Sequence, residues 1–202
     1  MTAGRNQSDN LAMSSLPGYR RFSVAEYLRM AEAGILRPDE RVELIDGQIV
    51  AMSPQGPVHS ALVPRIARHL DRLFPSDRYC IRQQATLPLG EDDAPEPDLA
   101  VVAGRCEEHE RAFPREVLLV VEVADSSVRL DRGRKSELYS AGGVPEYWLV
   151  DVPARLLEIR REPSGTGYKL IRVLQGDDTF LPAPLEGTGV VPLKAADVLP
   201  LP

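Results

Sequence analysis

Three stretches of the chain carry apolar residues at intervals of three and four, which predicts amphipathic helices. Ser23 followed by Glu26 fits a capping box at the start of the first stretch. Pro64 stands near the start of the second, and Gly142-Gly143 ends the third. The predicted helices cover residues 23–34, about 58–74 and about 129–141.

Further segments alternate apolar and polar residues, or run apolar throughout, between turn residues. Asp46-Gly47 separates two alternating segments and is a strong signal for a two-residue hairpin turn. The almost continuously apolar segment 116–127 is typical of a central strand covered on both faces. The predicted strands cover residues 41–45, 48–52, 79–89, 97–104, 116–127, 146–152, 155–162 and 167–174, and a short element follows at 191–200.

This order of elements predicts an α/β fold with a mixed central β-sheet flanked by helices, preceded by an additional N-terminal helix and β-hairpin. Residues 21–202 are expected to form a single domain. Residues 1–20 are polar, lack the apolar core of a signal peptide and are expected to form a flexible tail. A cytoplasmic protein is therefore expected.

The composition narrows the choice of function. The 202 residues include 30 acidic and 24 basic side chains, a formal net charge of −6. No apolar run approaches the roughly 20 residues of a membrane span. The acidic balance opposes non-specific coating of nucleic acid, but the basic residues cluster on two helices and leave room for a local DNA-facing patch. These clusters are Arg65, Arg68 and Arg72, and Arg129, Arg132, Arg134 and Lys135.

The two cysteines, Cys80 and Cys106, lie in no CxxC motif and at no metal-ligand spacing from the histidines. A disulfide scaffold or a structural zinc site is therefore not expected, and both cysteines are interpreted as small apolar residues.

Two carboxylates stand out against apolar surroundings. Glu122 lies inside the apolar strand 116–127, where an ionised carboxylate needs compensation. Asp98 follows Pro97 at the entrance of another strand. Two carboxylates on adjacent strand ends suit a hard divalent cation such as Mg²⁺, or Mn²⁺, which takes one or two protein carboxylates together with waters and substrate phosphate.

The Pro97-Asp98 pair followed by a strand with a buried Glu122 resembles the PD-(D/E)xK phosphodiesterase superfamily, which has the restriction-endonuclease-like fold. That pattern places a lysine two residues after the acid, where this chain has Ala124. The block RLDRGRKSELYSAGGVPEYWLVD, together with FSVAEYL, VELIDGQI, EPDLAVV and VVEVADSS, resembles the Uma-two family, whose lysine has moved to this helix.

The resemblance implies roles for four residues. Asp98 and Glu122 would bind the metal, and Lys135 would orient the attacking water or stabilise the transition state. Glu43 in VELIDG matches a further acidic residue near the same cleft. The family also implies a DNA substrate and a homodimer, so that both strands are cut.

Each residue also has a purely structural interpretation. Glu122 alone would fit a buried ion pair with an arginine, and Asp98 a turn at a strand end. Lys135 alone would fit a solvated helix face, and Glu43 the polar face of a hairpin. His59 fits either a phosphate contact or a cap, Tyr139 and Trp148 are interpreted as packing residues, and Gln83 and Gln84 as residues that border the cleft.

The leading hypothesis is a Mg²⁺-dependent endonuclease that hydrolyses DNA phosphodiester bonds by water attack. Ala124 and the acidic net charge favour an alternative, a catalytically inactive domain that binds nucleic acid or a protein. A two-carboxylate glycosidase ranks last, because aromatic residues make up only 5% of the chain and sugar sites need aromatic platforms.

Overall fold

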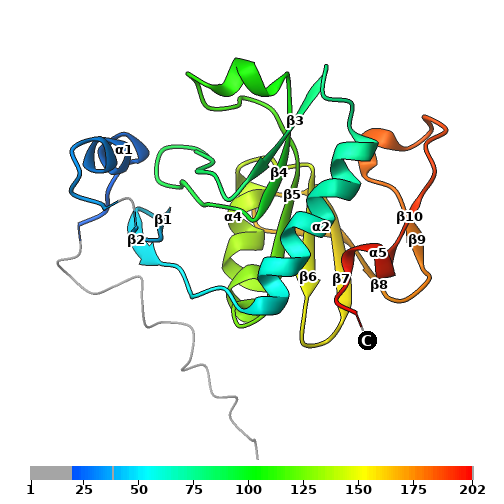
Figure 1. The fold of residues 1–202 in the computed structure, drawn as a ribbon. Helices are drawn as coiled ribbons and strands as arrows, with labels where there is room; N and C mark the ends of the chain where they lie inside the picture. The colour runs from blue at the N-terminus through cyan, green and yellow to red at the C-terminus, as the bar shows by residue number, and fades with distance from the viewer. Residues whose placement is uncertain (1–19, 38, 202) are drawn as a thin grey trace, which may run out of the picture.

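The structure is a computed structural model and describes residues 20–37 and 39–201 (Figure 1). The flexible tail predicted for residues 1–20 lies outside these residues, apart from Arg20. The helical elements are α1 (Val24–Glu32), α2 (Pro57–Leu73), η1 (Cys106–His109), α3 (Val128–Leu130), the π-helical turn η2 (Asp131–Lys135), α4 (Ser136–Ala141), η3 (Ala183–Leu185) and α5 (Ala195–Val198).

A six-stranded mixed sheet forms the centre of the fold, with the strand order β3-β4-β5-β6-β7-β8. Strands β5 and β6 are parallel, and the other neighbours are antiparallel. A hairpin about Pro153-Ala154 connects β6 to β7, between the strands predicted at 146–152 and 155–162. The strands of this sheet are β3 (Tyr79–Gln83), β4 (Leu99–Ala103), β5 (Val117–Ala124), β6 (Glu146–Asp151), β7 (Leu156–Pro163) and β8 (Tyr168–Leu174).

Helices cover both faces of the sheet. The apolar side of α2, which includes Leu62, Ile66 and Leu70, packs with Trp148 on one face, where α2 crosses the strands in Figure 1. The other face packs against Tyr139 and its neighbours on α4. Burial on both sides explains why β5 is apolar almost throughout and confirms its prediction as a central strand.

The predicted N-terminal helix and hairpin are also present. Ser23 and Glu26 form the capping box of α1. The hairpin consists of β1 (Val42–Ile45) and β2 (Gln48–Ala51). Its turn residues Asp46 and Gly47 have positive φ angles of 53° and 69°, as the sequence signal requires. A β-bridge between Leu44 and Ala94 joins the hairpin to the segment that precedes β4.

Three predicted elements differ from the structure. The third helix is not a continuous α-helix, because η2 interrupts it. Strand β3 ends at Gln83 rather than near residue 89, because Gln84 has a φ of 45° that breaks the extended backbone. The two-residue strand β9 (Thr179–Phe180), which pairs with β10 (Leu193–Lys194), is too short to give a periodic signal.

The prediction for the cysteines was wrong, because Cys80 and Cys106 form a disulfide bond. Their separation of 26 residues matches no motif, so no local pattern predicts this bond. The pairing follows from the sheet: Cys80 on β3 lies opposite Val102 on β4, and the chain turns back at Gly104 to place η1 beside β3. The bond ties the exposed η1 segment to the sheet.

None of the helices within the described residues combines the length and the apolar character needed to cross a bilayer.

We expect Cys106→Ser to lower the free energy of unfolding by about 3 kcal/mol, because the bond closes a loop of 26 residues and restricts the unfolded chain. Urea unfolding with and without reductant measures this loss, and Glu110→Gln, an exposed substitution just after η1, serves as the control. Two reactive thiols in the unreduced, unfolded protein would contradict the pairing.

Candidate active site

The two carboxylates singled out in the sequence lie at neighbouring strand ends. The antiparallel pair β4 and β5 has Leu99 opposite Val121, so the next pair along the ladder is Asp98 and Glu122. Residues opposite each other point to the same face of a sheet. Strand pairing alone therefore brings these carboxylates together, with 5% and 4% of their surfaces exposed.

Asp98 is fixed by three donors. Its Oδ2 accepts a hydrogen bond of 2.8 Å from the backbone N–H of Val123. Its Oδ1 lies 2.9 Å from His59 Nε2 and 3.4 Å from Gln84 Nε2. Because a carboxylate oxygen only accepts, His59 carries its proton on Nε2. The bond from Val123 N locks Asp98 to the strand that carries Glu122.

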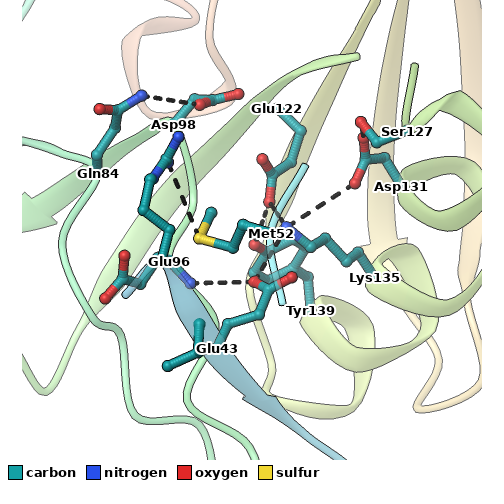
Figure 2. A network of polar contacts seen from close by, with 12 residues as sticks. Glu43, Met52, Gln84, Glu96, Asp98, Glu122, Ser127, Asp131, Lys135 and Tyr139 are labelled. Atoms are coloured by element: carbon teal, nitrogen blue, oxygen red, sulfur yellow. Dashed lines mark hydrogen bonds and ion pairs between the residues drawn. The ribbon is translucent and has the colours of Figure 1, made fainter. Parts of the chain in front are cut away.

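Glu122 is held by two residues of the η2 and α4 segment. Its Oε1 accepts hydrogen bonds from Tyr139 Oη at 2.6 Å and from Lys135 Nζ at 3.1 Å (Figure 2). Burial above all, together with smaller contributions from Asp131, Asp98 and Glu43, raises the pKa of Glu122 to about 8 against the opposing effect of Lys135. The ammonium of Lys135 therefore does not offset the cost of burying this carboxylate in its acidic surroundings.

Lys135 stands among three carboxylates. Its Nζ lies 3.1 Å from Glu122 Oε1, 3.1 Å from Glu43 Oε2 and 3.9 Å from Asp131 Oδ1. Burial by itself would lower the pKa of Lys135, but these carboxylates outweigh burial and raise the pKa above its ordinary value. The amine is therefore a permanent cation despite being only 4% exposed.

The helical segment presents three residues in one stripe. Asp131, Lys135 and Tyr139 are spaced by four, and all lie around Glu122 in Figure 2. An α-helix has about 3.6 residues per turn, so a side chain four positions later lies slightly more than one full turn around the axis. In the wider π turn η2, a side chain four positions later lies slightly less than one full turn around. The two deviations offset each other and keep the stripe facing the sheet.

Glu43 reaches the site from the N-terminal hairpin. It is 2% exposed, and its Oε2 also accepts from the backbone N–H of Glu96 at 3.3 Å. Its interpretation as the polar face of a hairpin strand is therefore wrong, because β1 is buried on both sides. Lys135 thus joins the hairpin to the central sheet.

These groups line one cavity of about 90 Å³. Its wall also includes residues from the segment after β2, from the end of β5 and from the start of α2. The polar residues of this wall are Arg41, Glu43, Ser53, Gln55, His59, Asp98, Glu122, Asp125, Ser126, Ser127, Asp131 and Lys135.

The cavity contains ligand atoms of the kind that hard cations bind, since Asp98 and Glu122 offer carboxylate oxygens. Within residues 20–37 and 39–201, no group of three or more His, Cys, Asp or Glu side chains is arranged to hold an ion. A pair of carboxylates matches Mg²⁺, which keeps most of its waters or takes substrate oxygens instead.

The structure brings all four residues selected from the sequence into contact or close proximity. The alternative for Glu122, an ion pair with an arginine, is wrong because its partner is Lys135. The alternative for Lys135, a solvated helix residue, is wrong because the side chain is buried.

Three further residues of the cluster were not selected from the sequence. For His59 and Tyr139, only the contacts with Asp98 and Glu122 distinguish a site residue from a cap and a packing residue. Asp131 belongs to no motif in the sequence, although its spacing of four residues before Lys135 is a usable signal.

A comparison with solved structures identifies the class of fold. A crystal structure from Anabaena variabilis ATCC 29413, described as "a putative nuclease belonging to DUF820", matches with a TM-score of 0.65 and 18% sequence identity. The match covers 88% of this chain and 97% of that one. The fold is restriction-endonuclease-like, as the sequence predicted.

The family follows from the sequence comparison. Residues 24–194 match the Uma2 family, described as "Putative restriction endonuclease". The chain belongs to this nuclease family, which confirms the resemblance found in its motifs. A search of curated proteins gave no match.

We expect Lys135→Met to destabilise the protein by about 3 kcal/mol at pH 8, because it leaves buried carboxylates without their cation. The loss should be small at pH 5. Lys135 lowers the pKa values of Glu122 and Asp131. Without it these values rise further above those of the unfolded chain, so stability falls as the pH rises.

Urea unfolding at both pH values measures this difference. Lys169→Met, which removes an exposed lysine from β8, is the matched control. An equal loss at pH 5 and pH 8, or a loss no larger than that of the control, would show that Lys135 does not neutralise the cluster.

Proposed function

We propose that the protein is a Mg²⁺-dependent endonuclease that hydrolyses DNA phosphodiester bonds, with Mn²⁺ able to replace Mg²⁺. Membership of a nuclease family supports the reaction class. One observation of the site carries the proposal: the buried carboxylates outnumber the buried ammonium beside them.

A surplus of buried acid is costly unless a cation offsets it. Burial is the main reason that the pKa of Glu122 rises to about 8, so a proton and a metal cation would compete for this carboxylate. A divalent cation at Asp98 and Glu122 would compensate the charge that Lys135 leaves over. When bound, Mg²⁺ supplies a Lewis acid and lowers the pKa of a bound water.

Each protein group then has a role in hydrolysis. Water attacks phosphorus, negative charge grows on the phosphoryl oxygens, and the bond to one sugar oxygen breaks. The permanent charge of Lys135 stabilises the growing negative charge or orients the water. His59 and Val123 N–H hold Asp98 in place, and Tyr139 does the same for Glu122.

Purified protein with Mg²⁺ should convert supercoiled plasmid to nicked or linear DNA. Asp98→Asn and Glu122→Gln keep the side-chain volumes but remove the charges. We expect each to lower the rate by about 100-fold or more, since they change the metal ligands themselves. Calorimetric titration should show Mg²⁺ binding to the wild type and much weaker binding to both variants.

Glu116→Gln is the control, because this exposed glutamate lies at the other end of β5. Wild-type activity in Asp98→Asn and Glu122→Gln would refute the site. A wild type that neither binds Mg²⁺ nor cuts DNA would refute the proposal, and RNA cleavage without DNA cleavage would refute its choice of substrate.

We further propose a homodimer, in which two copies present two sites to the two DNA strands. Strand β8 supports this arrangement, because it is an open edge of the sheet and exposes Leu170, Ile171 and Val173 by 40%, 50% and 54%. Edge strands with apolar side chains tend to pair with another strand, and identical strands pair about a two-fold axis.

Light scattering after size exclusion should give twice the monomer mass, and Ile171→Lys should give the monomer. Val191→Lys, at another exposed valine, should leave the dimer intact. A monomeric wild type at micromolar concentration would contradict this proposal.

We also propose a cytoplasmic location, because the proposed substrate is DNA, and fractionation of expressing cells tests it. Disulfides are uncommon in that compartment. We therefore expect Cys80 and Cys106 to be reduced there and to pair on oxidation.

A further inference from the structure

Arg41 differs from the other basic residues of the cavity in its partners. Lys135 contacts Glu122 and Glu43, and His59 contacts Asp98. The side chain of Arg41 also lines the cavity, directly before β1. Within the described part of the chain, its guanidinium contacts neutral groups instead of a carboxylate.

Two side chains from the segment after β2 hold this guanidinium. Arg41 Nη2 lies 3.9 Å from Met52 Sδ. The amide orientation of Gln55 that satisfies its neighbours places the oxygen 3.0 Å from both Nη1 and Nη2 of Arg41. The same amide oxygen faces Gln84 Nε2, which in turn donates to Asp98. Gln55 thus fixes the position of Arg41 relative to the carboxylates without neutralising it.

Within the residues that the structure describes, Glu96 forms no ion pair with Arg41 either. Burial raises the pKa of Glu96, while Thr86 and, more weakly, Arg41 oppose that rise. The carboxylate of Glu96 accepts a hydrogen bond of 3.1 Å from Thr86 Oγ1. Arg41 therefore influences Glu96 through space, while its side chain lines the cavity that holds Asp98 and Glu122.

We infer that Arg41 anchors a phosphate of the nucleic-acid backbone in this cavity. The inference rests on the proposed function and assigns a substrate-binding residue to it. A guanidinium presents paired N–H donors that match two oxygens of a phosphate. The surrounding carboxylates repel a phosphodiester, so an uncompensated cation with a fixed position supplies the attraction that the acid cluster lacks.

The inference predicts a defect in substrate binding that is separate from metal binding. We expect Arg41→Gln to raise the Kd for a fluorescent DNA duplex by about tenfold, because one charge-assisted contact is lost. The slope of log K against log salt concentration should fall by about 1. The Kd is measured by anisotropy with Ca²⁺ in place of Mg²⁺.

In cleavage assays with Mg²⁺, KM should rise more than kcat falls, and the Mg²⁺ titration should match the wild type. Arg41→Lys keeps the charge but loses the paired donors, so its salt slope should stay at the wild-type value while its Kd rises several-fold. Arg29→Gln removes an exposed charge from α1 and should change none of these quantities.

The outcomes separate this inference from the proposed function. If the wild type binds and cuts DNA but Arg41→Gln retains its Kd and its salt slope, the anchoring role is wrong and the nuclease assignment stands. If Arg41→Gln loses Mg²⁺ binding to the same extent as DNA binding, Arg41 supports the metal site rather than a phosphate. A wild type without DNA binding or cleavage overturns both. Should Arg41→Gln fail to fold, an unchanged Kd in Arg41→Lys refutes the paired contact.

Discussion

The buried ammonium of Lys135 is the contact on which the arrangement of the site depends. It touches Glu122 from the sheet and Glu43 from the hairpin, and Asp131 lies one helical turn away on its own element. Three parts of the fold thus share one cation. Removing a single partner from such a cluster leaves an uncompensated charge away from water, so each carboxylate constrains the position of the others.

The acid surplus in this cluster connects stability with chemistry. A cluster with as many buried cations as buried carboxylates would be neutral, and it would have little affinity for a metal ion. Here burial and the neighbouring acids outweigh Lys135, and the pKa of Glu122 rises to about 8. The folded protein therefore carries an electrostatic cost that a bound cation would relieve, as in many binding sites where local rules of stability are broken.

The parts predicted from the sequence are those with a local signal. The capping box of Ser23, the turn at Asp46 and the apolar run of β5 each depend on a few adjacent residues, and all three were predicted correctly. The pair Asp98 and Glu122 was found because acid in an apolar strand is unusual. Lys135 and Glu43 were selected through the family resemblance, since each also has an ordinary solvent-exposed interpretation.

Features that depend on distant contacts were not predictable in this way. The disulfide joins residues whose proximity follows from the register of β3 and β4, and the contact of His59 with Asp98 joins a helix to a strand end. The π turn arises within a charged segment whose composition is typical of a solvated helix. No short-range pattern distinguishes such a segment from one that contributes a buried lysine.

The π turn also has a consequence for how this site tolerates change in evolution. Because Asp131, Lys135 and Tyr139 share one stripe only while the turn is present, loss of one residue from η2 would rotate everything after it. Point substitutions on the outer side of the segment leave the stripe intact, whereas a one-residue deletion within η2 would rotate Lys135 and Tyr139 together away from Asp131. Length between Asp131 and Tyr139, rather than amino-acid identity, is thus the property that we expect natural variation to preserve.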